Sequence, residues 1–204
     1  MAETLTNLSC MLIEQRSVDE AALLLAEALA LYRAADNVWG QGFVHSTLGE
    51  AAWAAGDFAA ALASAEQGLV FHRQLQHQHR LSYSPLQCGQ VLLRLGRHEE
   101  ARSHLAEGLA ITLAHGFHEQ TTIVLVQAAL LSAAAGQPRR AAQLLGAAQA
   151  NIDRGGALVG RLDHAEFAQA QQRVQAQLPA ADWQAGWEAG LALSLREAAA
   201  MAFT

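Results

Sequence analysis

Histidine is the residue whose number and spacing most suggest chemistry in this sequence. The chain has nine histidines among its 204 residues, and His72, His77 and His79 stand together in the segment FHRQLQHQH. A metal-binding helix presents its ligands at positions i and i+4, as in the HExxH pattern. Here the intervals are five and two residues, and no carboxylate or cysteine stands beside them. We therefore interpret these histidines as part of a solvated connector, and a metal-dependent enzyme is kept only as a remote alternative.

The two cysteines carry no catalytic or disulfide signature. Cys10 and Cys88 lie 78 positions apart and make no disulfide framework, which favours a cytoplasmic chain with reduced thiols. No lysine or histidine next to either residue would lower the pKa of its thiol. The glycines between residues 155 and 160 do not form the GxGxxG pattern of a dinucleotide site. The sequence thus predicts a protein that is not an enzyme and that binds neither a metal nor a cofactor.

The composition narrows the class of partner. Hydrophobic residues make up 52% of the chain and charged residues 16%, so the chain can bury a core. The formal net charge of -6 argues against nucleic-acid binding by this segment. No apolar stretch is long enough to cross a bilayer, which needs roughly 18 or more residues. Glu3 stands where a signal peptide would have lysine or arginine, so we do not expect a signal peptide in this segment. We expect a cytoplasmic protein that contacts neither nucleic acid nor membrane.

A repeat with a period of 40 residues organises the chain. Gly56, Gly96 and Gly136 fall in register, and each stands between two stretches with apolar residues at three- and four-residue spacing. That spacing is typical of amphipathic helices, and glycine is typical of the left-handed residue that ends a helix. Small residues recur five positions after each junction, where two antiparallel helices can approach closely: Ala21, Ala61, Ala101 and Ala141.

We therefore predict an all-α fold of stacked helical hairpins, because one hairpin alone cannot bury its apolar face. The four predicted hairpins span about residues 2–34, 40–76, 81–115 and 119–153, and together they form a domain over 1–153. A Gly-rich loop follows at 154–162, and capping helices are expected over 163–204.

The small residues and the glycine between the helices resemble the tetratricopeptide repeat (TPR), whose usual period is roughly 34 residues. This resemblance implies a right-handed superhelix whose first helices line a concave groove. The tail segments GQPRRAAQLLGAAQ and DWQAGWEAGLALSLREAAA resemble the C-terminal end of LuxR-like and SARP-like bacterial transcriptional regulators of the ATP-dependent STAND type. The second resemblance implies signal transduction and transcription regulation, with the array as sensor or scaffold. The chain has no GxxxxGK[ST] motif, so ATP binding is not carried over.

The TPR resemblance also assigns the residues of the groove. The middle of the groove would combine aromatic side chains with polar ones, as a binding site does. The predicted binding residues are Phe43, Glu50, Trp53, Tyr83, Gln90 and Arg94. Its C-terminal end would be apolar, with Ile123, Val126, Leu130, Ala133 and Ala134. Alternatively, these apolar positions only pack against C-terminal helices that fold back.

Two functional hypotheses follow. The first is a module that binds a protein or peptide segment, or a small effector, in the groove. The second is a free-standing adaptor or a homodimerisation module. The first helix is apolar on several sides, with Cys10, Met11 and Ile13 beside its leucines, which favours an interface or a preceding hairpin there. The sequence leaves the identity of the ligand open, and also whether Met1 is a native start.

Overall fold

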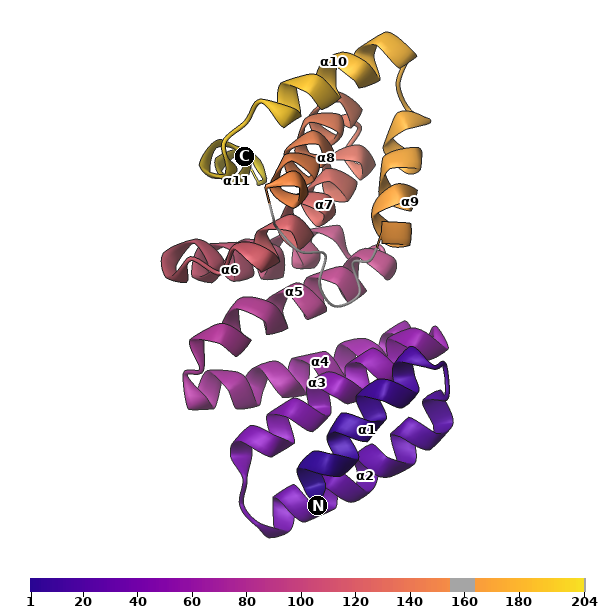
Figure 1. Cartoon of the computed structure of the whole chain (residues 1–204), viewed down its shortest axis with the longest axis vertical. Coiled ribbons are helices and arrows are strands. Elements are labelled where there is room, and N and C mark those ends of the chain that lie inside the picture. Colours follow the sequence, from indigo (N-terminus) through magenta and orange to yellow (C-terminus); the bar gives the residue numbers. More distant parts are fainter. Residues whose placement is uncertain (155–163, 204) are drawn as a thin grey trace. The chain divides into compact units, whose positions relative to one another are not determined.

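The computed structural model describes residues 1–154 and 164–203, and within them the chain is helical and contains no β-strand (Figure 1). The all-α, TPR-like prediction is confirmed. The chain divides into two compact units, Met1–Arg97 and His98–Thr204. Helices of the first unit are α1 (Ala2–Glu14), α2 (Val18–Ala34), α3 (Val38–Ala55), α4 (Phe58–Leu75) and α5 (Gln78–Arg94).

The second unit contains the last helices of the repeats and the C-terminal helices. Its elements are α6 (His98–His115), α7 (His118–Ala134), α8 (Pro138–Asp153), α9 (His164–Gln175), α10 (Ala180–Leu191) and α11 (Leu195–Met201). The predicted Gly-rich loop at 154–162 lies outside the described residues except for Arg154. The predicted division into array, loop and cap therefore stays a prediction.

Short polar and glycine-containing turns set the ends of the helices. The side chains of Asn37 and Asp57 accept hydrogen bonds from the backbone N–H groups of Gly40 and Ala60, which caps the first turns of α3 and α4. Gly56 follows α3 with a φ of 80°, in the left-handed region that glycine adopts without strain. Gly96 and Gly136, the other two glycines in register with it, have φ values of 73° and 74°.

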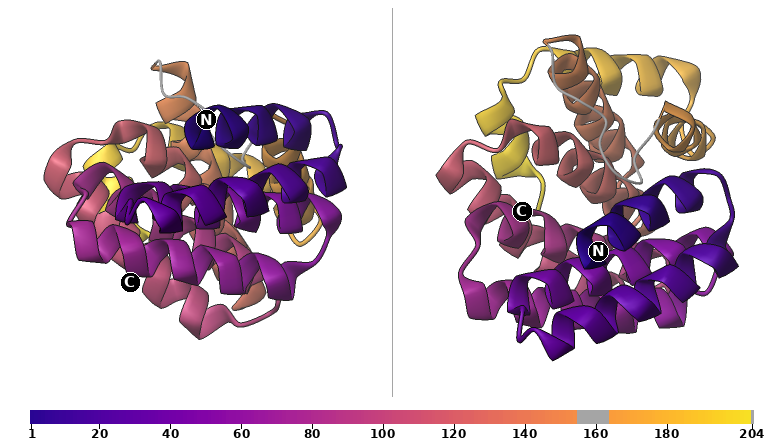
Figure 2. Two further views of the ribbon diagram at one scale, coloured as in Figure 1. Left: turned by 90° about the horizontal axis from the view of Figure 1, so that it is seen from below. Right: turned by 60° about the horizontal axis from the view of Figure 1, so that its bottom comes forward.

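In the first unit, successive helices pack against each other as antiparallel hairpins, α1 with α2 and α3 with α4 (Figure 2). Leu25, Ala28, Leu29 and Tyr32 of α2 share one buried cluster with residues of α3. The fit is close because α3 has glycine where it meets the aromatic ring: a Cβ on Gly40 would overlap the ring of Tyr32. The same packing brings α1 alongside α3 and α5 alongside α4.

In the second unit, the C-terminal helices cover the last hairpin. Helix α10 packs along α8, and both α9 and α11 pack on α7 and α8. Glycines make the closest approach possible: a Cβ on Gly190 would overlap the carbonyl oxygen of Gln143, and one on Gly146 would overlap the backbone of Trp187. Of the five apolar groove positions predicted on α7, Ile123, Val126 and Ala133 are buried, Leu130 is partly buried and Ala134 is exposed. Whether the C-terminal helices fill the predicted groove stays a prediction.

Candidate functional site

Trp53 and Arg94, two of the predicted groove residues, lie against each other in the first unit. Trp53 is in the last turn of α3 and Arg94 is the last residue of α5. The guanidinium carbon of Arg94 lies 5.1 Å from the centre of the Trp53 ring, within the range of a cation–π interaction. The Trp53 ring also meets the edge of the Phe58 ring, with centroids 5.1 Å apart. This end of α3 therefore presents a large aromatic surface that is only half buried.

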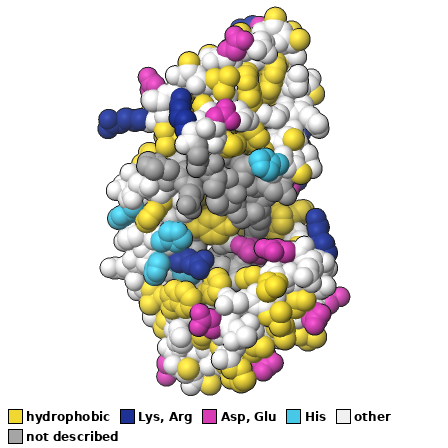
Figure 3. All heavy atoms as spheres, in the orientation of Figure 1, with side chains coloured by type: hydrophobic (Ala, Val, Ile, Leu, Met, Phe, Trp, Pro, Cys, Tyr) yellow, Lys and Arg dark blue, Asp and Glu magenta, His cyan; other side chains and the backbone are white. Residues whose placement is uncertain are grey.

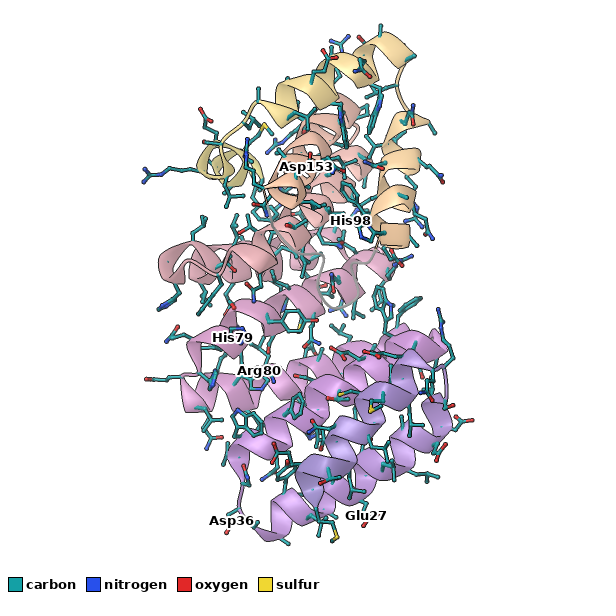
Figure 4. The ribbon with its side chains drawn as sticks, viewed as in Figure 1. Glu27, Asp36, His79, Arg80, His98 and Asp153 are labelled. Atoms are coloured by element: carbon teal, nitrogen blue, oxygen red, sulfur yellow. The ribbon has the colours of Figure 1, made fainter. Side chains whose placement is uncertain are left out.

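A second pair of the same kind lies nearer the start of both helices, about three turns earlier on α3 and about four turns earlier on α5. The guanidinium carbon of Arg80, near the start of α5, lies 4.7 Å from the centre of the Phe43 ring on α3. Figure 4 shows the Arg80 side chain extending from α5 toward the neighbouring helices of the first unit. Trp39, one turn before Phe43, packs on the same ring at a centroid distance of 5.5 Å. Both ends of α3 thus carry an aromatic group covered in part by an arginine of α5.

A hydrogen bond joins the two helices between these pairs. The amide Nε2 of Gln87 donates to Oε1 of Glu50 over 2.9 Å. Gln87 is 1% exposed, and its Oε1 is buried without a hydrogen-bond donor. A buried acceptor without a hydrogen-bond donor lowers the free energy of unfolding unless water or a ligand donates to it. This oxygen lies inside the packing, beside the Glu50–Gln87 hydrogen bond.

Helix α1 contributes a thiol beside these side chains of α3 and α5. Cys10 is half buried, and the Thr47 side chain of α3 is its hydrogen-bond partner. Burial raises the pKa of the Cys10 thiol above its ordinary value, and the nearby carboxylate of Glu50 raises it further. A thiol with a raised pKa is a poor nucleophile at neutral pH, so Cys10 here is a packing and hydrogen-bonding group.

We call this set of side chains from α1, α3 and α5 the three-helix face. It contains Cys10, Phe43, Thr47, Glu50, Trp53, Arg80, Gln87 and Arg94. Four of the six predicted groove residues belong to it. The other two, Tyr83 and Gln90, are also on α5, the first half buried and the second 5% exposed. Whether these residues bind a ligand stays a prediction.

Sequence reasoning missed Arg80 and Gln87 as members of this face. The signal that could have found them is the spacing, because Phe43 and Glu50 are seven residues apart, as are Arg80, Gln87 and Arg94. Residues seven apart lie on nearly the same side of a helix. Two parallel helices whose residues have this spacing can therefore bring their side chains into contact about every two turns.

The interpretation of His72 as part of a solvated connector is wrong. His72 is 0% exposed, and its Nδ1 shares a hydrogen bond of 2.7 Å with Oγ of Ser84, which ties α4 to α5. Burial lowers the pKa of His72 to about 4, and the charges of Arg80 and His77 add to this effect. Gly68 and Leu69, one turn before His72, are buried as well, so the ring lies on the packed side of α4 rather than in its connector.

The other two histidines of the segment lie on the surface. His77 is exposed and its Nδ1 accepts a hydrogen bond from the backbone N–H of Arg80, so it caps α5. His79 is exposed as well. Within residues 1–154 and 164–203, no three His, Cys, Asp or Glu side chains are grouped so that they could hold a metal ion.

A hollow of about 480 Å³ lies in the second unit. It is lined by Gly136, Gln137, Pro138, Arg139, Arg140 and Leu178. Its arginines contact the C-terminal helices. Arg139 donates to the carboxylate of Asp182 on α10 over 2.7 Å, and Arg140 donates to the backbone carbonyl of Met201 on α11. We interpret the hollow as the place where the C-terminal helices attach to α8.

Comparison with known families supports a repeat at the start of the chain. Residues 1–35 match a tetratricopeptide repeat. The matched segment is the hairpin of α1 and α2, which carries Cys10 of the three-helix face. No curated protein matches the chain, and no described helix is long and apolar enough to span a bilayer. The repeat match indicates a protein-interaction module.

Proposed function

We propose that the three-helix face binds a peptide segment of a partner protein. The observation that carries this proposal is the series of contacts between α3 and α5: an aromatic–arginine pair at each end and the Glu50–Gln87 hydrogen bond between them. Aromatic and arginine side chains that are partly exposed are the groups most often responsible for affinity at protein interfaces.

The chemistry of the face favours a peptide backbone. The carboxylate of Glu50 is only partly buried, and it would accept a hydrogen bond from a backbone N–H of an extended peptide. The rings of Phe43 and Trp53 lie on either side of this acceptor, so they would contact side chains on both sides of that amide. The guanidinium groups of Arg80 and Arg94 already lie against these rings, which limits the conformational freedom that binding would remove.

We further propose that the module belongs to a bacterial transcriptional regulator, in which peptide binding would be the sensed signal. The support for this context is the resemblance of the tail, in particular the segment AAQLLGAA at residues 141–148 and the pair Trp183 and Trp187. In the second unit, that segment is the part of α8 on which α10 packs. A free-standing adaptor with the same binding face is the alternative, and sequencing the DNA upstream of the codon for Met1 distinguishes the two.

The binding proposal is tested with peptides selected on the protein itself. Heptapeptides from a random phage-displayed library are selected on the full chain, synthesised with a fluorescein label, and their affinities measured by fluorescence anisotropy. The variant Trp53→Ala/Arg94→Ala should weaken their binding by roughly 30-fold or more, the size of a loss at an interface hot spot. Helicity and Tm should change little, because Arg94 is exposed and Trp53 only half buried.

The matched control is Trp183→Ala/Arg139→Ala, which removes a half-buried tryptophan and an exposed arginine from the second unit. This control should bind the selected peptides like the unmodified protein. If the Trp53→Ala/Arg94→Ala variant retained full affinity, or if both variants lost it equally, the proposed site would be wrong.

A further inference from the structure

The charged side chains of the three-helix face stand in an alternating order along α3 and α5. The Arg80 guanidinium lies over the ring of Phe43 at one end of the face. The Arg94 guanidinium lies over the ring of Trp53 at the other end. Between them, the Glu50 carboxylate accepts its hydrogen bond from α5. A ligand that lies along the face therefore meets positive, negative and positive charge in turn.

These three charged groups can contact a ligand. Arg94 is exposed, and Arg80 and Glu50 are partly buried. In Figure 3, basic, acidic and hydrophobic side chains lie together on the surface of the first unit. A guanidinium can donate up to about five hydrogen bonds, and a carboxylate can accept up to about four. Each group can therefore keep its partners within the protein and still contact a bound segment.

The thiol of Cys10 shows that both kinds of charge lie near the same part of the face. Burial is the largest cause of the raised pKa of this thiol, and the carboxylates of Glu50 and Glu14 raise it further. The charge of Arg80 acts on the same thiol in the opposite direction. Because such effects decrease with distance, these charges lie close to one side chain of α1. Negative charge on the face thus comes from α1 as well as from α3.

The length of the face matches that of a short extended segment. Phe43 and Trp53 are ten residues apart on α3, which corresponds to about 15 Å along the helix axis. An extended strand rises about 3.4 Å per residue, so the first and fifth residues of a segment are about 14 Å apart. Alternate side chains of such a strand point to the same side. The first, third and fifth side chains can therefore face α3 and α5 together.

We propose that the segment bound at the three-helix face carries an acidic side chain at each end and a basic side chain midway between them. The acidic side chains would contact Arg80 and Arg94, and the basic one would contact Glu50. This inference rests on the proposed peptide-binding function and adds the charge pattern of the partner. The pattern is internal to the segment, so it needs no free chain terminus. The reverse pattern would place like charges against each other at all three positions.

The test is a phage-displayed library of heptapeptides with three restricted positions. The second, fourth and sixth residues are each glutamate, lysine or alanine, and the other residues are random. The library is selected on the full chain, and each combination is counted by sequencing before and after selection. We expect Glu–Lys–Glu to be enriched roughly tenfold or more over Lys–Glu–Lys. Added salt should reduce this ratio, because the contacts that distinguish the two patterns are between partly exposed charges.

Charge reversal on the protein assigns the two ends of the segment. On Arg94→Glu, the preferred residue at one end should change from glutamate to lysine, and on Arg80→Glu the same change should occur at the other end. The matched control is Arg33→Glu, because Arg33 is exposed on α2, which contributes no side chain to the face. This control should select the same combination as the unmodified protein. Partial unfolding of a variant would reduce the recovery of all combinations alike, whereas an exchange of preference requires the charge itself.

The outcomes separate this inference from the proposed function. If the recovered peptides require Trp53 and Arg94 but contain Glu–Lys–Glu and Lys–Glu–Lys equally often, the face binds peptides and the charge pattern is wrong. If no peptide is recovered, or if the recovered peptides bind Trp53→Ala/Arg94→Ala equally well, both proposals are wrong. Enrichment of Glu–Lys–Glu that stays the same in Arg80→Glu and Arg94→Glu would overturn the assignment to this face. Enrichment whose end preferences follow the two arginines supports the proposal.

Discussion

The buried histidine on α4 predicts a specific loss of stability in mild acid. His72 is fully buried and shares its hydrogen bond with Ser84, and its folded-state pKa of about 4 lies below the ordinary value of 6.5. Between these two values, the unfolded chain binds a proton at this residue that the folded protein does not. The free energy of unfolding therefore decreases as the pH falls from about 6.5 to about 4, and this contribution is constant below that range.

The size of the effect follows from the two pKa values. Each pKa unit is equivalent to about 1.4 kcal/mol, and the proton linkage from this one histidine amounts to about 2 kcal/mol between about pH 7 and about pH 5. Such a change shifts the urea midpoint by roughly 1 M for a chain of this size. The protein has nine histidines. The contribution of His72 is therefore obtained by subtracting the stability of a His72 variant from that of the unmodified protein at each pH.

The assay is urea unfolding followed by circular dichroism at a series of pH values, for the unmodified protein and for His72→Asn. Asparagine retains a polar group near the position of Nδ1, although the smaller side chain lowers stability at every pH. The difference in stability between the two proteins should shrink by about 2 kcal/mol as the pH falls from about 7 to about 5. Parallel pH profiles for the two proteins would refute the reasoning, since another group would then cause the acid sensitivity.

Two further predictions concern packing and the thiol. Gly190→Ala should destabilise the second unit by about 1–3 kcal/mol, because its Cβ would overlap the Gln143 carbonyl oxygen. Gly136→Ala has open space around it and should cost only about 1 kcal/mol for its φ of 74°, so equal shifts in Tm would contradict this account. Glu50→Gln should speed alkylation of Cys10 by iodoacetamide roughly twofold or more, measured by mass spectrometry, because it removes a charge that raises the pKa of that thiol. An unchanged rate would mean that burial alone sets this pKa.

The local signals in the sequence predicted the helices well. Glycine between the two helices of the second, third and fourth predicted hairpins predicted left-handed turns, and Gly56, Gly96 and Gly136 adopt them. The apolar spacing predicted which stretches are helical, because it reflects packing that each helix requires on one side. His72 was misinterpreted because helix periodicity does not show how far the last turn of α4 remains packed, whereas His77 and His79 are exposed.

The candidate site was predicted only in part. Phe43, Glu50, Trp53 and Arg94 were assigned from a repeat pattern, and the structure brings them into contact with α5 or α3 side chains. Tyr83 and Gln90 were assigned in the same way, and their side-chain partners do not follow from the pattern. Arg80 was missed, because the pairing of Arg80 with Phe43 depends on the register between two helices that no local motif specifies.

The sequence by itself determined the all-α class, the 40-residue repeat and the turns between helices. These features depend on interactions between residues that are close along the chain, such as caps, left-handed glycines and amphipathic spacing. Tertiary structure alone decided that His72 is buried against Ser84 and that Gln87 reaches Glu50. Each of these depends on which helices are neighbours and at what register, and a pattern read along one helix contains no information on either.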